Sequence, residues 1–346
     1  MVKFNITMEI NSIQTPVTSP PKIITSIIAG FNAVANNIYL ILMPIILDLF
    51  LLFGPKLRLQ KVLDPYLQEA IRNLNTLSSA EMMDMVDLTK EMWTAILTEY
   101  NLFSLLRTFP IGIPSLLAGQ PIQSSPLGRS ITFDVNSWGE LILYCILLIL
   151  VGITLGSIYF NEVERNSRDN KRPYSYQVSI WQIIQSYLLT GILFILLSLF
   201  LIPASIIVSI IAIFSPVIGQ ITLLLGMLIT IWIFIPLFFS PHGIFASQQN
   251  ALISAMSSYR LIKSFLPGTG LFMVIILLIS QGLNILWLIP PTTSWFILVG
   301  IAGHSFVSTS LLAASFNYYL MGTHWMKAVI ERQSSVKDVK APTFSN

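Results

Sequence analysis

Few side chains in this sequence could carry chemistry, and one acid stands out among them. Asp48 lies within an apolar run from Ile38 to Phe53. A carboxylate inside a membrane-spanning segment is costly, which indicates a functional residue unless a partner neutralises it. Lys56 and Arg58 follow shortly after the run, and an ion pair with either would satisfy Asp48. The functional and the structural interpretation of Asp48 both stay open.

The histidines and the cysteine give no sign of a metal site. His304 lies in a later apolar run with no Cys, Asp or Glu nearby in sequence, which is more typical of a packing residue than of a ligand or proton relay. His242 and His324 have no metal-ligand spacing. Cys145 is the single cysteine, so an internal disulfide or an all-cysteine metal site is excluded. We therefore expect no metal and no cofactor.

Catalytic motifs are equally scarce. The sequence contains no Walker loop, dinucleotide-binding glycine pattern, zinc-binding helix motif or nucleophile elbow. The stretch from Asn170 to Ile330 has no Asp or Glu. A membrane enzyme would have to be centred on Asp48 and His304, and the two side chains would have to lie close together. The sequence predicts that the protein is not an enzyme.

Uncharged polar side chains inside apolar runs form a second group of candidates. They could line a path for a solute, or they could form hydrogen bonds between helices. The sequence is compatible with both interpretations, although packing is the commoner role. The positions are Gln182, Gln185, Gln220, Gln281 and Asn284.

Composition places these residues in a helical membrane protein. Of 346 residues, 54% are hydrophobic and 10% are charged, whereas soluble domains carry about 25% charged residues. Several apolar runs reach about twenty residues, which suits helices that cross a bilayer and is too long for barrel strands. The net charge of +3 is too small to indicate nucleic-acid binding.

We expect an all-α polytopic membrane protein with six transmembrane helices arranged as three hairpins, with interfacial amphipathic helices. An isoleucine-rich stripe from Ile23 to Val34 predicts an amphipathic helix along the membrane surface. The last span is rich in small residues from Gly300 to Ser315, which predicts close packing at the centre of the bundle. The predicted spans are 38–53, 138–160, 180–213 with a kink at Pro203, 217–239, 270–289 and 295–320.

The predicted organisation has five parts. The segment 57–137 contains residues 109–121, which are rich in Gly and Pro yet apolar, so we expect them to pack on the span ends or to enter the headgroups. The parts are a disordered cytoplasmic tail (1–20), an interfacial helix plus first span (21–56), an extracytoplasmic helical insertion (57–137), a five-span bundle (138–326) and a basic cytoplasmic tail (327–346).

Charge distribution predicts the orientation. Twelve Lys and Arg residues lie in the two termini and in the loops 161–176 and 241–267, and none lies in the two short loops on the other side. The positive-inside rule then places both termini in the cytoplasm. The densest basic cluster either contacts anionic lipid headgroups or simply reflects this topology. It consists of Arg165, Arg168, Lys171 and Arg172.

One segment resembles a known family. Ser240-Pro241-His242-Gly243-Ile244-Phe245, followed by Ala251, Ala255, Ser258, Tyr259, Arg260, Leu261, Ile262 and Lys263, resembles the cytoplasmic helix of YciC-like six-span bacterial proteins and of the membrane domain of some glycerophosphodiester phosphodiesterases. The insertion 57–137 departs from the YciC-like pattern, and no phosphodiesterase domain is attached, so no enzyme activity carries over. The resemblance implies six helices with interfacial helices in the cytoplasmic membrane of a bacterium.

Together these observations favour a non-enzymatic integral membrane protein that acts through contacts with membrane lipids or other membrane proteins, as a scaffold, in assembly or in envelope homeostasis. The alternative is a transporter or channel for an uncharged or lipid-like solute. Its path would be lined by Gln185, Gln281, Asn284 and His304. No nucleic-acid partner is expected.

Overall fold

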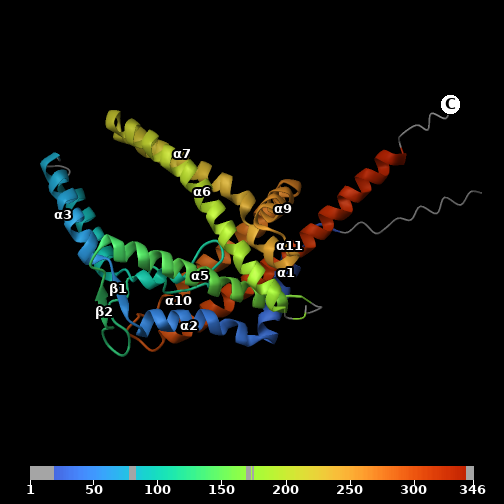
Figure 1. Ribbon diagram of the computed structural model, residues 1–346, viewed down its shortest axis with the longest axis horizontal. Helices are drawn as coiled ribbons and strands as arrows, with labels where there is room; N and C mark the ends of the chain where they lie inside the picture. The colour runs from blue at the N-terminus through green and yellow to red at the C-terminus, as the bar shows by residue number, and fades with distance from the viewer. Residues whose placement is uncertain (1–18, 78–82, 169–172, 174, 340–346) are drawn as a thin grey trace, which may run out of the picture.

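The chain folds almost entirely into helices. The computed structural model describes residues 19–77, 83–168, 173 and 175–339 (Figure 1). The first part contains α1 (Ile23–Asn36), the 3-10 helix η1 (Ile38–Ile41), α2 (Leu42–Phe53), β1 (Lys56–Arg58), α3 (Gln60–Leu77), α4 (Met83–Glu99), the 3-10 helix η3 (Leu102–Leu106) and β2 (Thr132–Asp134). The second part contains α5 (Trp138–Asn166), α6 (Tyr176–Phe214), α7 (Pro216–Phe234), the 3-10 helix η4 (Ile235–Leu237), α8 (Ser240–Ser247), α9 (Ala251–Ser264), α10 (Leu266–Trp287) and α11 (Ile297–Val339).

The predicted helical fold is confirmed, and its helices are consistent with the predicted membrane class. Among the described residues, five helical segments are long and apolar enough to cross a membrane, and α1 with η1 and α2 gives a sixth if this bent pair is one span. The three-hairpin arrangement remains a prediction. α11 continues to Val339, so the described part of the predicted basic tail is helical. The predicted N-terminal tail lies outside the described residues except for its last two positions.

α1 packs on α11 through small side chains. The axes of α1 and of the helix that follows it differ by 95°. A Cβ atom on Gly30 would lie 2.4 Å from the backbone of both Ser310 and Ala314, so the two helices touch closely there. Ile23 and Ile27 pack against the main core and Val34 is buried in it, whereas Ile24 and Ile28 remain exposed. One side of the isoleucine stripe therefore packs on protein, and the other side is left for contact with lipid.

β1 and β2 join the two ends of the segment 57–137. They pair in parallel, with Lys56 opposite Thr132 and Arg58 opposite Asp134. The Arg58 Nε donates a hydrogen bond to Asp134 Oδ1 at 3.0 Å. α3 lies beyond this small sheet at one edge of the molecule (Figure 1). We call this the sheet end of the bundle.

α6 and α7 form an apolar hairpin that leaves the bundle. Figure 1 shows the hairpin diverging from α5. In each of these two segments, the most apolar stretch of 18 residues has no buried residue, whereas 61% of the corresponding stretch of α11 is buried. α6 continues as one helix through Pro203. Its apolar part, 180–214, is about 50 Å long at 1.5 Å per residue, so it must tilt strongly to stay within a hydrocarbon core of about 30 Å.

The opposite end of the bundle is built by α8 and α9. α8 is buried almost throughout, although the sequence predicted a loop over 241–267. α9 buries one side, which includes Ser254 and Ser258, and leaves Leu252 and Met256 exposed. We call this the α9 end. Its neighbour α11 is the most buried of the candidate spans, which confirms the central position predicted from its small residues.

Candidate functional site

Asp48 is fully buried in α2 and is bonded to a segment far away in sequence. Its Oδ1 accepts hydrogen bonds from the Ser115 hydroxyl at 2.5 Å and from the Leu117 amide at 3.1 Å. Its Oδ2 accepts one from the Leu116 amide at 3.0 Å. Three donors thus converge on one carboxyl group, which is the arrangement that stabilises a buried negative charge.

The ion pair that the sequence suggested for Asp48 does not form. Lys56 is buried and donates to the carbonyl of Ile122 instead. Arg58 pairs with Asp134. The short spacing from Asp48 to these cations was misleading, because the chain turns at Gly54 and carries both into the sheet region rather than back along α2.

The segment that meets Asp48 is a non-helical loop, residues 107–122, which reaches deep into the bundle. It packs on two glycines of α5. A Cβ on Gly152 would lie 2.7 Å from the carbonyl oxygen of Leu106, and one on Gly156 would lie 2.6 Å from the Cα of Gly112. Gly152 lies about 21 Å along α5 from its start at the sheet end. The start of the loop therefore lies at the depth of the middle of a span, and Gly112 lies slightly beyond that depth.

Irregular backbone at this depth needs internal hydrogen-bond partners, because lipid offers none. The loop has them. Besides the bonds to Asp48, the Ser104 hydroxyl accepts a hydrogen bond from the Gly119 amide at 3.2 Å and ties the loop to the preceding helix η3. The Asn101 side chain accepts a hydrogen bond from the Leu57 amide at 3.1 Å and anchors the start of η3 to the sheet. The apolar side chains of the loop, such as Ile111 and Leu117, lie in the main hydrophobic core.

A lateral cavity of about 530 Å³ opens between this loop, α5 and the base of the α6–α7 hairpin. Its walls are almost entirely apolar, and Arg107 is the one charged residue among the described residues that line it. We call it the Arg107 cleft. It is lined by Leu105, Arg107, Thr108, Phe109, Ile149, Ile153, Tyr187, Thr190, Gly191, Leu193, Phe194, Leu197 and Phe234.

Arg107 carries a charge that the described part of the protein does not pair. Its side chain is exposed, and its Nη1 donates to the carbonyl of Ser115 at 3.2 Å. None of the ion pairs among the described residues includes it. Its charge attracts the carboxylate of Asp48 and opposes a positive charge on His304, but Asp48 already accepts three other hydrogen bonds. The remaining donors of Arg107 can therefore bind an anion in the cleft.

Of the four polar positions proposed for a solute path, the structure brings two together. The Nδ1 of His304 and the Oδ1 of Asn284 lie 2.8 Å apart and link α11 to α10. Gln281 is exposed on α10. Gln185 lies elsewhere: its Oε1 accepts from the amide of Ala251 at 2.9 Å and caps the start of α9. No hydrogen bond among the described residues joins Asp48 to His304.

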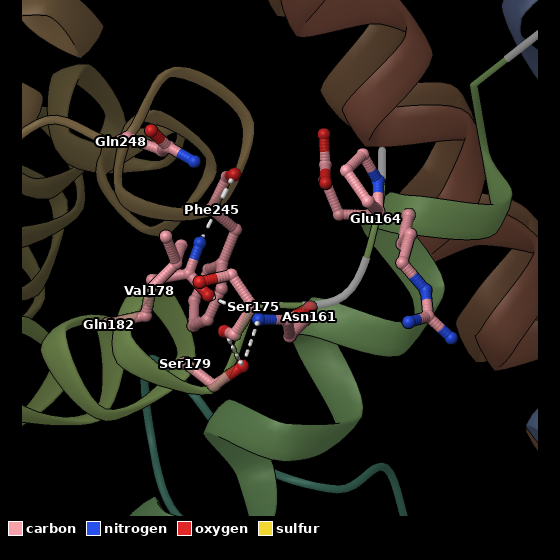
Figure 2. A pocket seen from close by; sticks show the side chains of 10 residues that line it. Asn161, Glu164, Ser175, Val178, Ser179, Gln182, Phe245 and Gln248 are labelled. Atoms are coloured by element: carbon pink, nitrogen blue, oxygen red, sulfur yellow. Dashed lines mark hydrogen bonds between the residues drawn. The ribbon is translucent and has the colours of Figure 1, made fainter. Parts of the chain in front are cut away.

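At the α9 end, polar side chains join α5, α6 and α8 around a cavity of about 220 Å³. Figure 2 shows the Asn161 amide donating to Ser179 and to Gln182, and the Gln182 amide directed at the carbonyl of Phe245. Each polar group of Gln182 is thus used between helices. This geometry fits the packing interpretation of Gln182.

The predicted basic cluster is only partly within the described residues, because Lys171 and Arg172 lie outside them. Arg165 forms an ion pair with Glu162 at 2.9 Å. Arg168 pairs with Glu164 and also donates to the carbonyl of Ala246. Arg168 is therefore held in place at the point where α5 meets the end of α8.

No group of three or more His, Cys, Asp or Glu residues suited to a metal ion occurs among the described residues. His242 instead lies 2.7 Å from the hydroxyl of Ser315 and is surrounded by aromatic rings. Cys145 is a free thiol. We therefore assign packing roles to His242 of α8, Ser315 of α11 and Cys145 of α5.

Asp48 and the apolar loop residues 109–121 were singled out from the sequence, but Arg107 and the depth of the loop were missed. One signal was present: Arg107 is the sole charged residue between Asn101 and Gly128, in a segment rich in Leu, Ile, Gly and Pro. A lone arginine among apolar breakers is typical of a loop that lies within protein or membrane. We found no match for this chain among protein-family models, curated proteins or solved structures.

Proposed function

We propose that this chain is a non-enzymatic integral membrane protein that holds an anionic membrane lipid in the Arg107 cleft. The observation that carries the proposal is the unpaired Arg107 charge at the depth of the middle of a span. An arginine at that depth costs about 2.5 to 3.5 kcal/mol or more without a partner, so such residues usually mark a functional site.

The chemistry of Arg107 favours a phosphate or carboxylate partner. A guanidinium group presents several donors in a plane and binds such anions through two parallel hydrogen bonds. One donor of Arg107 is already used on Ser115, which fixes the side chain against the loop. The remaining donors are available to the anionic group of a bound molecule.

The walls of the cleft favour acyl chains. Ile149 and Ile153 of α5 face Leu197 of α6 and Phe234 across the cavity. The cavity lies where α6 and α7 diverge from α5 (Figure 1). An amphipathic lipid with one anionic group therefore matches both the charge and the apolar surface of the cleft.

We further propose the orientation predicted from charge. The α9 end, with the paired basic residues Arg165 and Arg168, faces the cytoplasm, and the segment 57–137 at the sheet end faces outward. The membrane is then the cytoplasmic membrane of a bacterium, as the resemblance to YciC-like proteins implies. Other membrane proteins that dock on the exposed α6–α7 hairpin are further candidate partners.

Native mass spectrometry of the protein, extracted gently from its own membrane, tests the proposal. We expect a retained anionic lipid in the wild type, loss of that lipid in Arg107→Gln, and partial retention in Arg107→Lys. The matched control is Arg129→Gln, which removes an exposed charge outside the cleft. Equal lipid retention in Arg107→Gln and in the control would overturn the proposal.

The depth of Arg107 favours a second candidate function, the transfer of lipid between leaflets. A headgroup that reaches Arg107 has left the membrane surface, because its neighbours Ile149 and Ile153 lie near the middle of the apolar part of α5. Transfer of a fluorescent anionic phospholipid in reconstituted vesicles measures this directly. Faster transfer with the wild type than with Arg107→Gln would support it, and equal rates would exclude it.

A further inference from the structure

A second cavity, of about 480 Å³, lies at the α9 end, and its lining is basic. Four side chains that carry or can carry a positive charge converge on it from three parts of the fold. Arg168 follows the end of α5, Arg260 comes from α9, and His324 and Lys327 come from α11. We call this cavity the basic pocket. Its other lining residues are Ala246, Ser247, Gln249, Ser257, Leu320, Thr323 and Met326.

The basic pocket contains no carboxylate among its described lining residues. Glu164 neutralises Arg168 from outside the pocket. Arg260, His324 and Lys327 are exposed, and none of the ion pairs among the described residues includes them. Arg260 of α9 and Lys327 of α11 thus hold positive charges around one cavity, and an anion bound between them would offset their mutual repulsion.

Polar groups in the same pocket favour a ligand that also carries hydroxyl groups. The hydroxyls of Ser247 and Ser257 line the cavity and can donate to an oxyanion. The Thr323 hydroxyl, which also lines the cavity, already donates its proton to the carbonyl of Leu320 at 3.0 Å, so it can only accept from a ligand. An acceptor cannot bind an unprotonated phosphate oxygen, so it suits the hydroxyl of a polyol attached to the phosphate.

We propose that the basic pocket binds the phosphate group of a phosphorylated polyol. The same chemistry occurs in the glycerophosphate headgroup of a membrane lipid and in a soluble phosphate ester. The pocket begins at Leu320, beside the buried part of α11, and extends to the exposed Lys327, so both sources can reach it. This site is independent of the Arg107 cleft, from which it differs in residues and in elements.

Isothermal titration of the full chain in nanodiscs of zwitterionic lipid, with glycerol 1-phosphate as the probe, tests the proposal. We expect saturable binding, weakened about thirtyfold in the double variant Arg260→Gln with Lys327→Gln, because each basic residue near a lipid surface contributes about fivefold. The control is Lys263→Gln, which removes a charge from α9 outside the pocket and should leave the affinity unchanged.

A second arm identifies the source of the phosphate. When the nanodiscs contain phosphatidylglycerol, a pocket that takes lipid headgroups will be occupied and will no longer bind glycerol 1-phosphate. A pocket that takes soluble esters will bind it as before. Absence of saturable binding in zwitterionic nanodiscs, or equal weakening by Lys263→Gln, would overturn the proposal. Arg107→Gln should leave this binding unchanged, which separates the two sites.

Discussion

The loop at Asp48 and the α6–α7 hairpin differ in how their backbone polar groups are satisfied. The loop places irregular, polar backbone at the depth of a span, and the protein supplies its partners through Asp48, Ser115 and Ser104. The hairpin has its backbone bonds satisfied within its own helices and exposes apolar side chains almost throughout. Protein therefore surrounds the loop, whereas the side chains of the hairpin are left for contact with lipid. The Arg107 cleft lies at the border between the two.

The largest effect should come from removing the carboxylate that holds the loop. Asp48→Ala leaves the Leu116 and Leu117 amides and the Ser115 hydroxyl without their acceptor inside the bundle. Each unsatisfied buried donor costs about 1 to 3 kcal/mol, so we expect a loss of about 4 kcal/mol. A thermal melt in detergent measures it, with Glu69→Ala on the exposed face of α3 as the control. A melting temperature equal to that of the control would show that the loop does not depend on Asp48.

A slightly smaller effect should follow from a larger residue at the contact of α1 with α11. In Gly30→Leu, the new side chain meets the backbone of Ser310 and Ala314, which cannot move aside. We expect a loss of about 3 kcal/mol, at the upper end of the usual cost of overpacking. Gly282→Leu on α10, where a new side chain meets open space, is the matched control in the same melt. Equal stability of the two variants would contradict the close packing of α1.

These two predictions also show what the sequence could and could not provide. Small residues at Ser310 and Ala314 predicted close packing of the last span, because that signal depends on residue type alone. Asp48 was recognised as unusual, but its partners lie 67 to 69 residues further along the chain, and no periodic pattern links them. Arg107 was missed because an apolar loop rich in Gly and Pro predicted a position at the span ends or in the headgroups, whereas the depth of the loop is set by Gly152 and Gly156 on another helix.

Within α6, a Leu→Ala change should have a larger effect where the helix packs on the core than where it is exposed in the hairpin. Leu189 is fully buried in the core, whereas Leu199 is 71% exposed in the hairpin. Leu189→Ala should cost about 2 to 3 kcal/mol through the cavity that it leaves. Leu199→Ala should change stability by less than about 0.5 kcal/mol. Thermal melts of the pair compare the two positions directly, and equal losses would mean that the hairpin packs against protein in solution.

The smallest effect concerns Lys56 at the sheet end of the loop. Burial lowers the pKa of its ammonium group, and the Glu99 charge opposes this shift. Between the lowered pKa and the ordinary value of about 10.5, the unfolded chain binds more protons than the folded one, so stability rises with pH in that window. Lys56→Met should lack this rise. Melting temperatures of both proteins between about pH 8 and pH 10 test it, and parallel curves would be contrary to the prediction.

Site-specific photocrosslinking tests most directly whether a lipid anion lies beside Arg107. A benzoylphenylalanine at Phe109, which lines the cleft and is 77% exposed, is compared with one at Leu143, a lipid-facing position of α5 outside the cleft. We expect lipid crosslinked at position 109 to be enriched in anionic species over lipid crosslinked at 143, and Arg107→Gln to remove the enrichment. The same lipid composition at both positions would contradict it.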